Sequence, residues 1–144
     1  MFICNHCPYV VHIVHELVQV ANDFLPKGIG FVAISSNDAA QYPQDGPDLM
    51  RVFASEHQFP FPYCYDESQE VAKDYDAACT PDFSVTDAHG KVVYRGEFDA
   101  ARPSLPIPVT GDSLRKVLNG LVDGVSPEAE GQRPSMGCNI KWKL

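Results

Sequence analysis

Hydrophobic positions in residues 8–25 repeat with the period of an α-helix. The apolar side chains that share one face of this helix are Val10, Ile13, Val14, Leu17, Val18, Ala21, Phe24 and Leu25. Pro26 and Gly28 follow, and both residue types favour the end of a helix. The pattern therefore predicts an amphipathic helix over residues 8–25.

A continuous apolar run follows this helix. Residues 29–35, with the sequence IGFVAIS, have the length of a strand and no alternation of polar and apolar positions. Such a run is typical of a parallel strand that is buried on both faces. Because the short apolar run Phe2-Ile3 precedes the helix, the order strand, helix, strand predicts an α/β fold.

Three further helices are predicted downstream. The first runs from about Asp48 to His57, in a region that we interpret as an insertion between core elements. A short helix is expected over residues 67–75. The last helix covers residues 114–122, and Gly111-Asp112-Ser113 is suited to its N-terminal cap.

Two strand patterns and an irregular tail complete the chain. Residues 83–87 and 91–98 are predicted to form an antiparallel hairpin whose turn contains His89-Gly90. We expect one domain over residues 1–124 and a C-terminal tail over residues 125–144. Although the tail lacks periodicity, it contains Cys138, Ile140 and Trp142, so we expect it to dock on the domain and to bring Cys138 near other thiols.

Charge and composition exclude several classes of function. The 11 Lys and Arg residues against 19 Asp and Glu residues give a net charge of -8, and the basic residues form no stripe, so a nucleic-acid partner is not expected. No apolar run approaches the roughly 18 residues of a membrane span, and the start lacks the features of a signal peptide. We expect a cytoplasmic protein with no membrane partner. The sequence does not indicate its oligomeric state.

The five cysteines stand at positions 4, 7, 64, 79 and 138, an odd number that does not suit a framework of structural disulfides. Catalytic or metal-binding thiols are therefore favoured. We interpret Cys64, between Tyr63 and Tyr65 in a strand-like run, as a core residue without a chemical role.

The motif Cys4-Asn5-His6-Cys7 is the strongest chemical signal. Its position before the first helix predicts that the helix end stabilises a Cys4 thiolate, which makes Cys4 the nucleophile. Cys7 lies one helical turn away and is expected to resolve a mixed disulfide, while a protonated His6 would stabilise the thiolate of Cys4. The same spacing is half of many zinc sites, but a strand before the motif and a helix after it favour redox use, with no metal.

Beyond the motif, four segments resemble the thioredoxin superfamily, in particular its redoxin branch, which is related to alkyl hydroperoxide reductase and thiol-specific antioxidant proteins. These segments are FICNHCPYV, GFVAISSND, FPFPYCYDESQEVAKDYDAACTPDF and VTDAHGKVVYRGEFD. The resemblance implies a thioredoxin-like fold: a central mixed β-sheet flanked by helices, with an insertion before the strand that begins at a cis-proline. The elements that the family carries before Phe2 are missing, so the chain looks N-terminally shortened.

The resemblance also implies roles for Thr80 and Pro81. In this family the corresponding proline is cis and faces the active disulfide, and the backbone beside it pairs with an extended segment of the substrate. Thr80 and Pro81 are therefore expected to bind substrate.

Three residues near these sites are possible accessory groups. Cys79 precedes Pro81 by two residues and could approach Cys4, and Cys138 could do so from the tail. Asp82 could relay protons to Cys7. Ordinary packing would explain Cys79 equally well, and a polar strand edge would explain Asp82 without chemistry, whereas packing accounts less readily for Cys138 in an irregular tail.

We therefore expect a thiol-disulfide oxidoreductase that exchanges electrons with protein thiols and disulfides. Its own Cys4–Cys7 disulfide would be the redox group, without another cofactor. A thiol peroxidase is the first alternative, but peroxiredoxins use a Thr-x-x-Cys arrangement and Cys4 occupies the threonine position. A soft-metal-binding module is the second alternative, with Cys4 and Cys7 joined by Cys79, Cys138 or His6.

Overall fold

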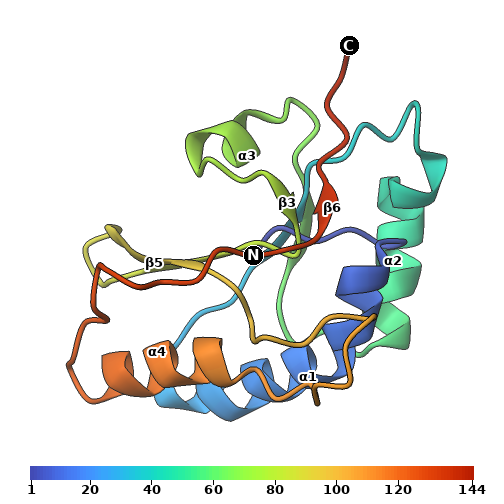
Figure 1. The fold of residues 1–144 in the computed structure, drawn as a ribbon. Helices are drawn as coiled ribbons and strands as arrows, with labels where there is room; N and C mark the ends of the chain where they lie inside the picture. The colour runs from blue at the N-terminus through green and yellow to red at the C-terminus, as the bar shows by residue number, and fades with distance from the viewer.

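The computed structural model describes residues 1–144, which form a mixed α/β structure (Figure 1). The helices are α1 (Pro8–Phe24), α2 (Pro47–Glu56), α3 (Glu70–Asp74) and α4 (Asp112–Val122), with 3-10 turns η1 (Leu25–Lys27) and η2 (Pro43–Asp45). The strands are β1 (Ala33–Ser35), β2 (Tyr63–Tyr65), β3 (Cys79–Thr80), β4 (Phe83–Thr86), β5 (Val92–Gly96) and β6 (Cys138–Asn139).

The N-terminal residues occupy the centre of the sheet. Phe2 forms a parallel bridge with Ile34 of β1 and an antiparallel bridge with Asp82, just before β4. Because β1 pairs in parallel with β2 and β4 pairs antiparallel with β5, the strands follow the order β2, β1, N-terminal segment, β4, β5. This is the central mixed sheet that the resemblance implies.

The helices cover both faces of this sheet. In Figure 1, α1 and α4 lie side by side along the bottom of the view, and α3 lies above the sheet. One core cluster joins α1 and α4 to β4 and β5 through residues such as Leu17, Leu118 and Phe83. On the other face, Phe2 packs with Ala72 of α3 and with Ile140 of the tail. Since neighbouring strand residues point to opposite faces, Ile3 turns toward α1, where it packs with Val10 and Val14.

Two sequence predictions need correction. The strand expected over residues 29–35 is regular only from Ala33 to Ser35, opposite the three residues of β2. Cys64 is exposed and is not a core residue, because Tyr63 and Tyr65 take the more covered face of β2 and the alternation turns Cys64 to solvent. The predicted hairpin is confirmed by the antiparallel pairing of β4 with β5.

The tail docks along the domain. Its hydrogen bonds with β5 begin at Gln132, whose side-chain amide donates to the carbonyl oxygen of Val93 at 3.0 Å, and continue at Ser135, whose hydroxyl donates to the carbonyl oxygen of Gly96 at 2.6 Å. β6 then pairs antiparallel with β3, with Cys138 opposite Thr80 and Asn139 opposite Cys79. In Figure 1 these two strands lie next to each other at the centre of the molecule, although about sixty residues separate them in sequence.

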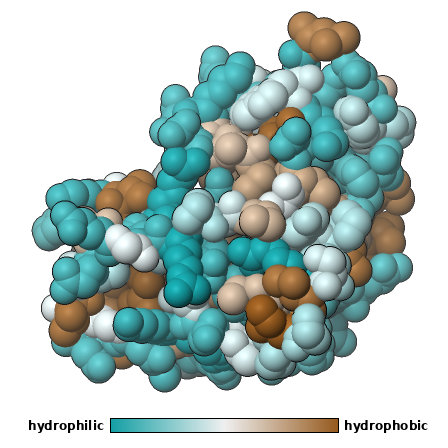
Figure 2. Space-filling model, in the orientation of Figure 1, coloured by the Kyte–Doolittle hydropathy of each residue, from teal (hydrophilic) through white to brown (hydrophobic).

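The surface on this side is predominantly hydrophilic, with smaller apolar areas between the polar side chains (Figure 2). Such a surface fits the net charge of -8. None of the helices combines the length and the apolar character needed to cross a membrane.

Candidate active site

The CxxC motif lies between the central N-terminal segment and α1. The helix begins at Pro8, and Cys7 is its N-cap residue. A proline suits the first helical position because the N–H that it lacks would have no partner within the helix. The helix starts at Pro8 as the sequence predicts, but its N-cap is Cys7, whereas we expected the helix end to act on Cys4.

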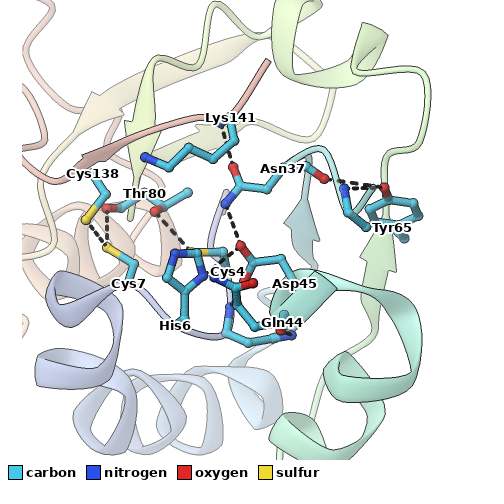
Figure 3. Close-up of polar contacts among 12 residues, drawn as sticks. Cys4, His6, Cys7, Asn37, Gln44, Asp45, Tyr65, Thr80, Cys138 and Lys141 are labelled. Carbon is cyan, nitrogen blue, oxygen red and sulfur yellow. Dashed lines mark hydrogen bonds and ion pairs between the residues drawn. The ribbon is translucent and has the colours of Figure 1, made fainter. Parts of the chain in front are cut away.

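Both sulfurs of the motif are buried and lie against Thr80 (Figure 3). The Sγ of Cys4 is 3.5 Å from the hydroxyl oxygen of Thr80, and the Sγ of Cys7 is 3.3 Å from the carbonyl oxygen of the same residue. Thr80 ends β3, and the Thr80–Pro81 peptide bond is cis. One residue beside the cis-proline thus contacts both sulfurs.

The two thiols of the motif differ in how readily they lose a proton. A hydrogen bond with Cys4 lowers the pKa of Cys7 to about 4, with a smaller contribution from Cys138, although burial opposes the shift. The same hydrogen bond, together with burial, raises the pKa of Cys4. The N-cap position of Cys7 acts in the same direction, because a helix N-terminus favours negative charge. The thiolate that we expected on Cys4 is therefore favoured on Cys7.

Asp45 organises the polar side of the motif. Its carboxylate is fully buried and lies 2.7 Å from the Nδ1 of His6. It also accepts hydrogen bonds from the backbone N–H of Asn5 and from the side-chain amide of Asn37, each at 3.0 Å. His6 additionally stacks on Tyr42, with 6.4 Å between the ring centroids. Asp45 therefore holds the Asn5-His6 segment between the two cysteines.

Sequence reasoning missed Asp45. It lies in the 3-10 turn of the insertion, between two prolines, and no periodic pattern distinguishes it from a surface acid. Its role depends on the packing of this turn against residues about forty positions away. A ring nitrogen of His6, the Sγ of Cys4 and a carboxylate oxygen of Asp45 all lie within 4.8 Å of one another, so this group also offers three donor atoms of the kinds that bind metal ions.

Cys138 is the third thiol at the site. Its Sγ lies 2.9 Å from the Sγ of Cys7, and the residue is only partly buried (Figure 3). Burial, followed by the hydrogen bond to Cys7, raises the pKa of Cys138 to about 11.

Cys79 and Asp82 do not contact the two sulfurs of the motif. Thr80 faces Cys4, so alternation along β3 turns Cys79 away, and its thiol contacts the carbonyl oxygen of Pro81 at 3.7 Å. Burial raises the pKa of Cys79 to about 11.

Asp82 accepts a hydrogen bond from the N–H of Ala78 and lies 3.8 Å from the guanidinium of Arg95. Burial raises the pKa of its carboxyl group. These contacts with Ala78 and Arg95 do not connect Asp82 to Cys7, as a proton relay between them would require.

The mixed sheet, the CxxC motif at the start of α1 and the adjacent cis-proline together define a protein of the thioredoxin-like class. Residues 1–108 match the Redoxin family model, and the chain belongs to this family. It is therefore a member of a superfamily of thiol-based oxidoreductases and peroxidases.

Two solved structures resemble the whole chain. An uncharacterised conserved protein from Geobacillus kaustophilus is 60% identical with a TM-score of 0.96, and the match covers 99% of this chain and 75% of that one. A hypothetical protein from Sinorhizobium meliloti 1021 is 43% identical with a TM-score of 0.95, covering 99% of this chain and 77% of that one. No curated protein matches the sequence.

Proposed function

We propose that this protein is a thiol-disulfide oxidoreductase that exchanges electrons with protein thiols through the Cys4–Cys7 pair. The observation that carries the proposal is the placement of both sulfurs against Thr80, beside the cis-proline, at the start of a helix. One acidic thiol with a second thiol as its hydrogen-bond partner is the arrangement that a dithiol needs to form and break a disulfide.

The position of the thiolate reverses the roles that we expected for Cys4 and Cys7. We expected Cys4 to attack and Cys7 to resolve, but the helix end and the lowered pKa both lie at Cys7. We therefore propose Cys7 as the attacking sulfur and Cys4 as the sulfur that closes the intramolecular disulfide. The Asp45 carboxylate lies close to Cys4 and raises its pKa further, which fits this order.

The proposed activity is tested by incubating the reduced protein with a model protein disulfide and a low-molecular-weight thiol as the electron source. Wild-type protein is expected to accelerate reduction of the model disulfide, and a variant in which both Cys4 and Cys7 are serine is expected to reach only the uncatalysed rate. The Cys64→Ser variant is the matched control, because Cys64 is exposed to solvent whereas both sulfurs of the motif are buried. Equal rates for wild type and the double variant would contradict the proposal.

A thiol peroxidase is the competing activity, and the same preparations distinguish it. A peroxidase would oxidise a cysteine to a sulfenic acid and consume hydrogen peroxide catalytically. We expect slow, stoichiometric consumption of peroxide together with catalytic exchange of disulfides. Rapid catalytic turnover of peroxide without disulfide exchange would show that the protein is a thiol peroxidase instead.

A further inference from the structure

The C-terminal tail occupies the edge of β3 that a substrate segment is expected to use. β6 pairs with β3 and places Cys138 directly opposite Thr80. The tail thus presents a cysteine to the CxxC motif as an extended disulfide-bearing partner would.

Several independent contacts hold the tail in this position. The N–H of Ile140 donates to the carbonyl oxygen of Ala78 at 3.2 Å, and the side chain of Ile140 is buried. The N–H of Lys141 donates to Asn37 at 2.9 Å, and the amide of Asn37 in turn donates to Asp45. The tail and the loop that holds His6 therefore share one hydrogen-bond network (Figure 3).

Gly137 allows this close approach. A Cβ atom at this position would overlap the carbonyl oxygen of Thr80. The tail can therefore pass over β3 beside the two sulfurs only with a glycine before Cys138.

The three sulfurs differ in their access to solvent. Cys4 and Cys7 are 1% and 0% exposed, whereas Cys138 is partly exposed. With the tail docked, a partner protein can reach the Cys138 sulfur more readily than either sulfur of the motif.

From this arrangement we propose that Cys138 is a third catalytic thiol, which carries the disulfide between the buried Cys4–Cys7 pair and the partner protein. The proposal rests on the proposed function. The 2.9 Å between Cys7 Sγ and Cys138 Sγ is close enough for exchange with only a small movement of the side chains.

The transfer balances without an added oxidant or reductant. The Cys138 thiolate attacks the Sγ of Cys7 in the Cys4–Cys7 disulfide, so that the Cys7–Cys138 bond forms and the Cys4–Cys7 bond breaks. The electron pair leaves on the sulfur of Cys4, which takes up a proton in place of the one that Cys138 has lost. The number of disulfides is unchanged, and the bond now includes the accessible sulfur.

A partner dithiol completes the cycle. One partner thiolate attacks the Sγ of Cys138 and releases Cys7 as a thiolate, and the second partner thiolate then displaces Cys138 as the partner's own disulfide closes. The partner is oxidised by two electrons, and Cys4 and Cys7 are left reduced. Cys7 is a good leaving group because its pKa is lowered to about 4.

Oxidation of the motif also prepares Cys138 for attack. In the reduced protein burial is the largest cause of the raised pKa of Cys138, and the hydrogen bond to Cys7 and the charge of Cys7 add to it. The two contributions of Cys7 disappear when Cys7 is in a disulfide, whereas the ammonium of Lys141, which lowers the pKa, stays in place.

The test is to map disulfides after mild oxidation of the full chain with diamide, followed by rapid alkylation, digestion and mass spectrometry. Wild-type protein is expected to contain both Cys4–Cys7 and Cys7–Cys138 linkages. The Cys4→Ser variant should form the Cys7–Cys138 linkage alone. Adding Gly137→Ala to Cys4→Ser should slow its formation by roughly tenfold or more, because it displaces the tail without removing a thiol.

Cys79→Ser is the matched control, since Cys79 lies on β3 next to Thr80 but faces away from the motif. The disulfide pattern of this variant should equal that of wild type. Oxidised wild type with only the Cys4–Cys7 linkage would overturn the third thiol and leave the proposed function standing, and a Cys4→Ser variant that keeps both thiols free would lead to the same conclusion. Wild type that forms neither linkage would overturn both. The wild-type map decides the question even if the serine variants fold poorly.

Discussion

Replacing Cys7 by serine is expected to remove the thiolate signal of the reduced protein over a wide pH interval. This interval extends from the lowered pKa of Cys7, about 4, to the ordinary cysteine pKa of 9.0. A group with a lowered pKa is charged above that pKa and loses its charge only when the pH falls through it. Wild type should therefore show one thiolate by ultraviolet absorbance at neutral pH, with a transition near the lower limit. The variant should show none until alkaline pH.

Two further variants make this titration specific. Cys64→Ser should keep the acidic transition unchanged, because Cys64 is exposed and does not contribute to the lowered pKa of Cys7. Cys4→Ser should keep a thiolate transition but move it upward, since the hydrogen bond with Cys4 is the largest cause of the lowered pKa. If Cys7→Ser retained the acidic transition and Cys4→Ser lost it, the charge would belong to Cys4 and the proposed order of attack would be reversed.

Replacing Asp45 by alanine is expected to lower the free energy of unfolding by about 1–3 kcal/mol, the cost of leaving a buried hydrogen-bond donor without its acceptor. The fully buried carboxylate is paired with His6 and accepts two further hydrogen bonds. Alanine would leave the N–H of Asn5 and the amide of Asn37 without an acceptor, and each stranded donor carries a cost. Denaturant unfolding of wild type and variant measures the difference.

Asp48→Ala is the matched control for this experiment. Asp48 follows Asp45 closely in sequence, but its side chain is 95% exposed and pairs only with Arg51 at the surface. Surface pairs of this kind contribute little, so the control should unfold close to wild type. Equal destabilisation by the two substitutions would show that the Asp45 network does not hold the motif.

Much of the fold could be predicted because local patterns determine it. The apolar stripe of α1 identified its buried face almost residue by residue, and the strand patterns of β4 and β5 identified the hairpin. The shortness of β1 and the exposure of Cys64 could not be predicted in this way. Both depend on the three-residue pairing with β2 and on which face of that strand the rest of the chain covers.

The candidate site was partly predictable for the same reason. The CxxC spacing identifies Cys4 and Cys7, but the distribution of charge between them depends on where the helix begins and on which donors surround each sulfur. Asp45 reaches the motif only through the folding of an insertion, so no local pattern could indicate it. The position of Cys138 depends on strand pairing across about sixty residues, which the apolar residues of the tail suggested but could not specify.

The central claim is that Cys4 and Cys7 form a reversible redox pair, and a redox titration of the full chain tests it most directly. The protein is equilibrated in glutathione buffers of stepped potential, alkylated and mapped by mass spectrometry. We predict a single two-electron transition in which Cys4 and Cys7 lose their free thiols together, or Cys7 is shared with Cys138, while Cys64 and Cys79 stay reduced. Free thiols at both Cys4 and Cys7 across the whole series of potentials would contradict the account.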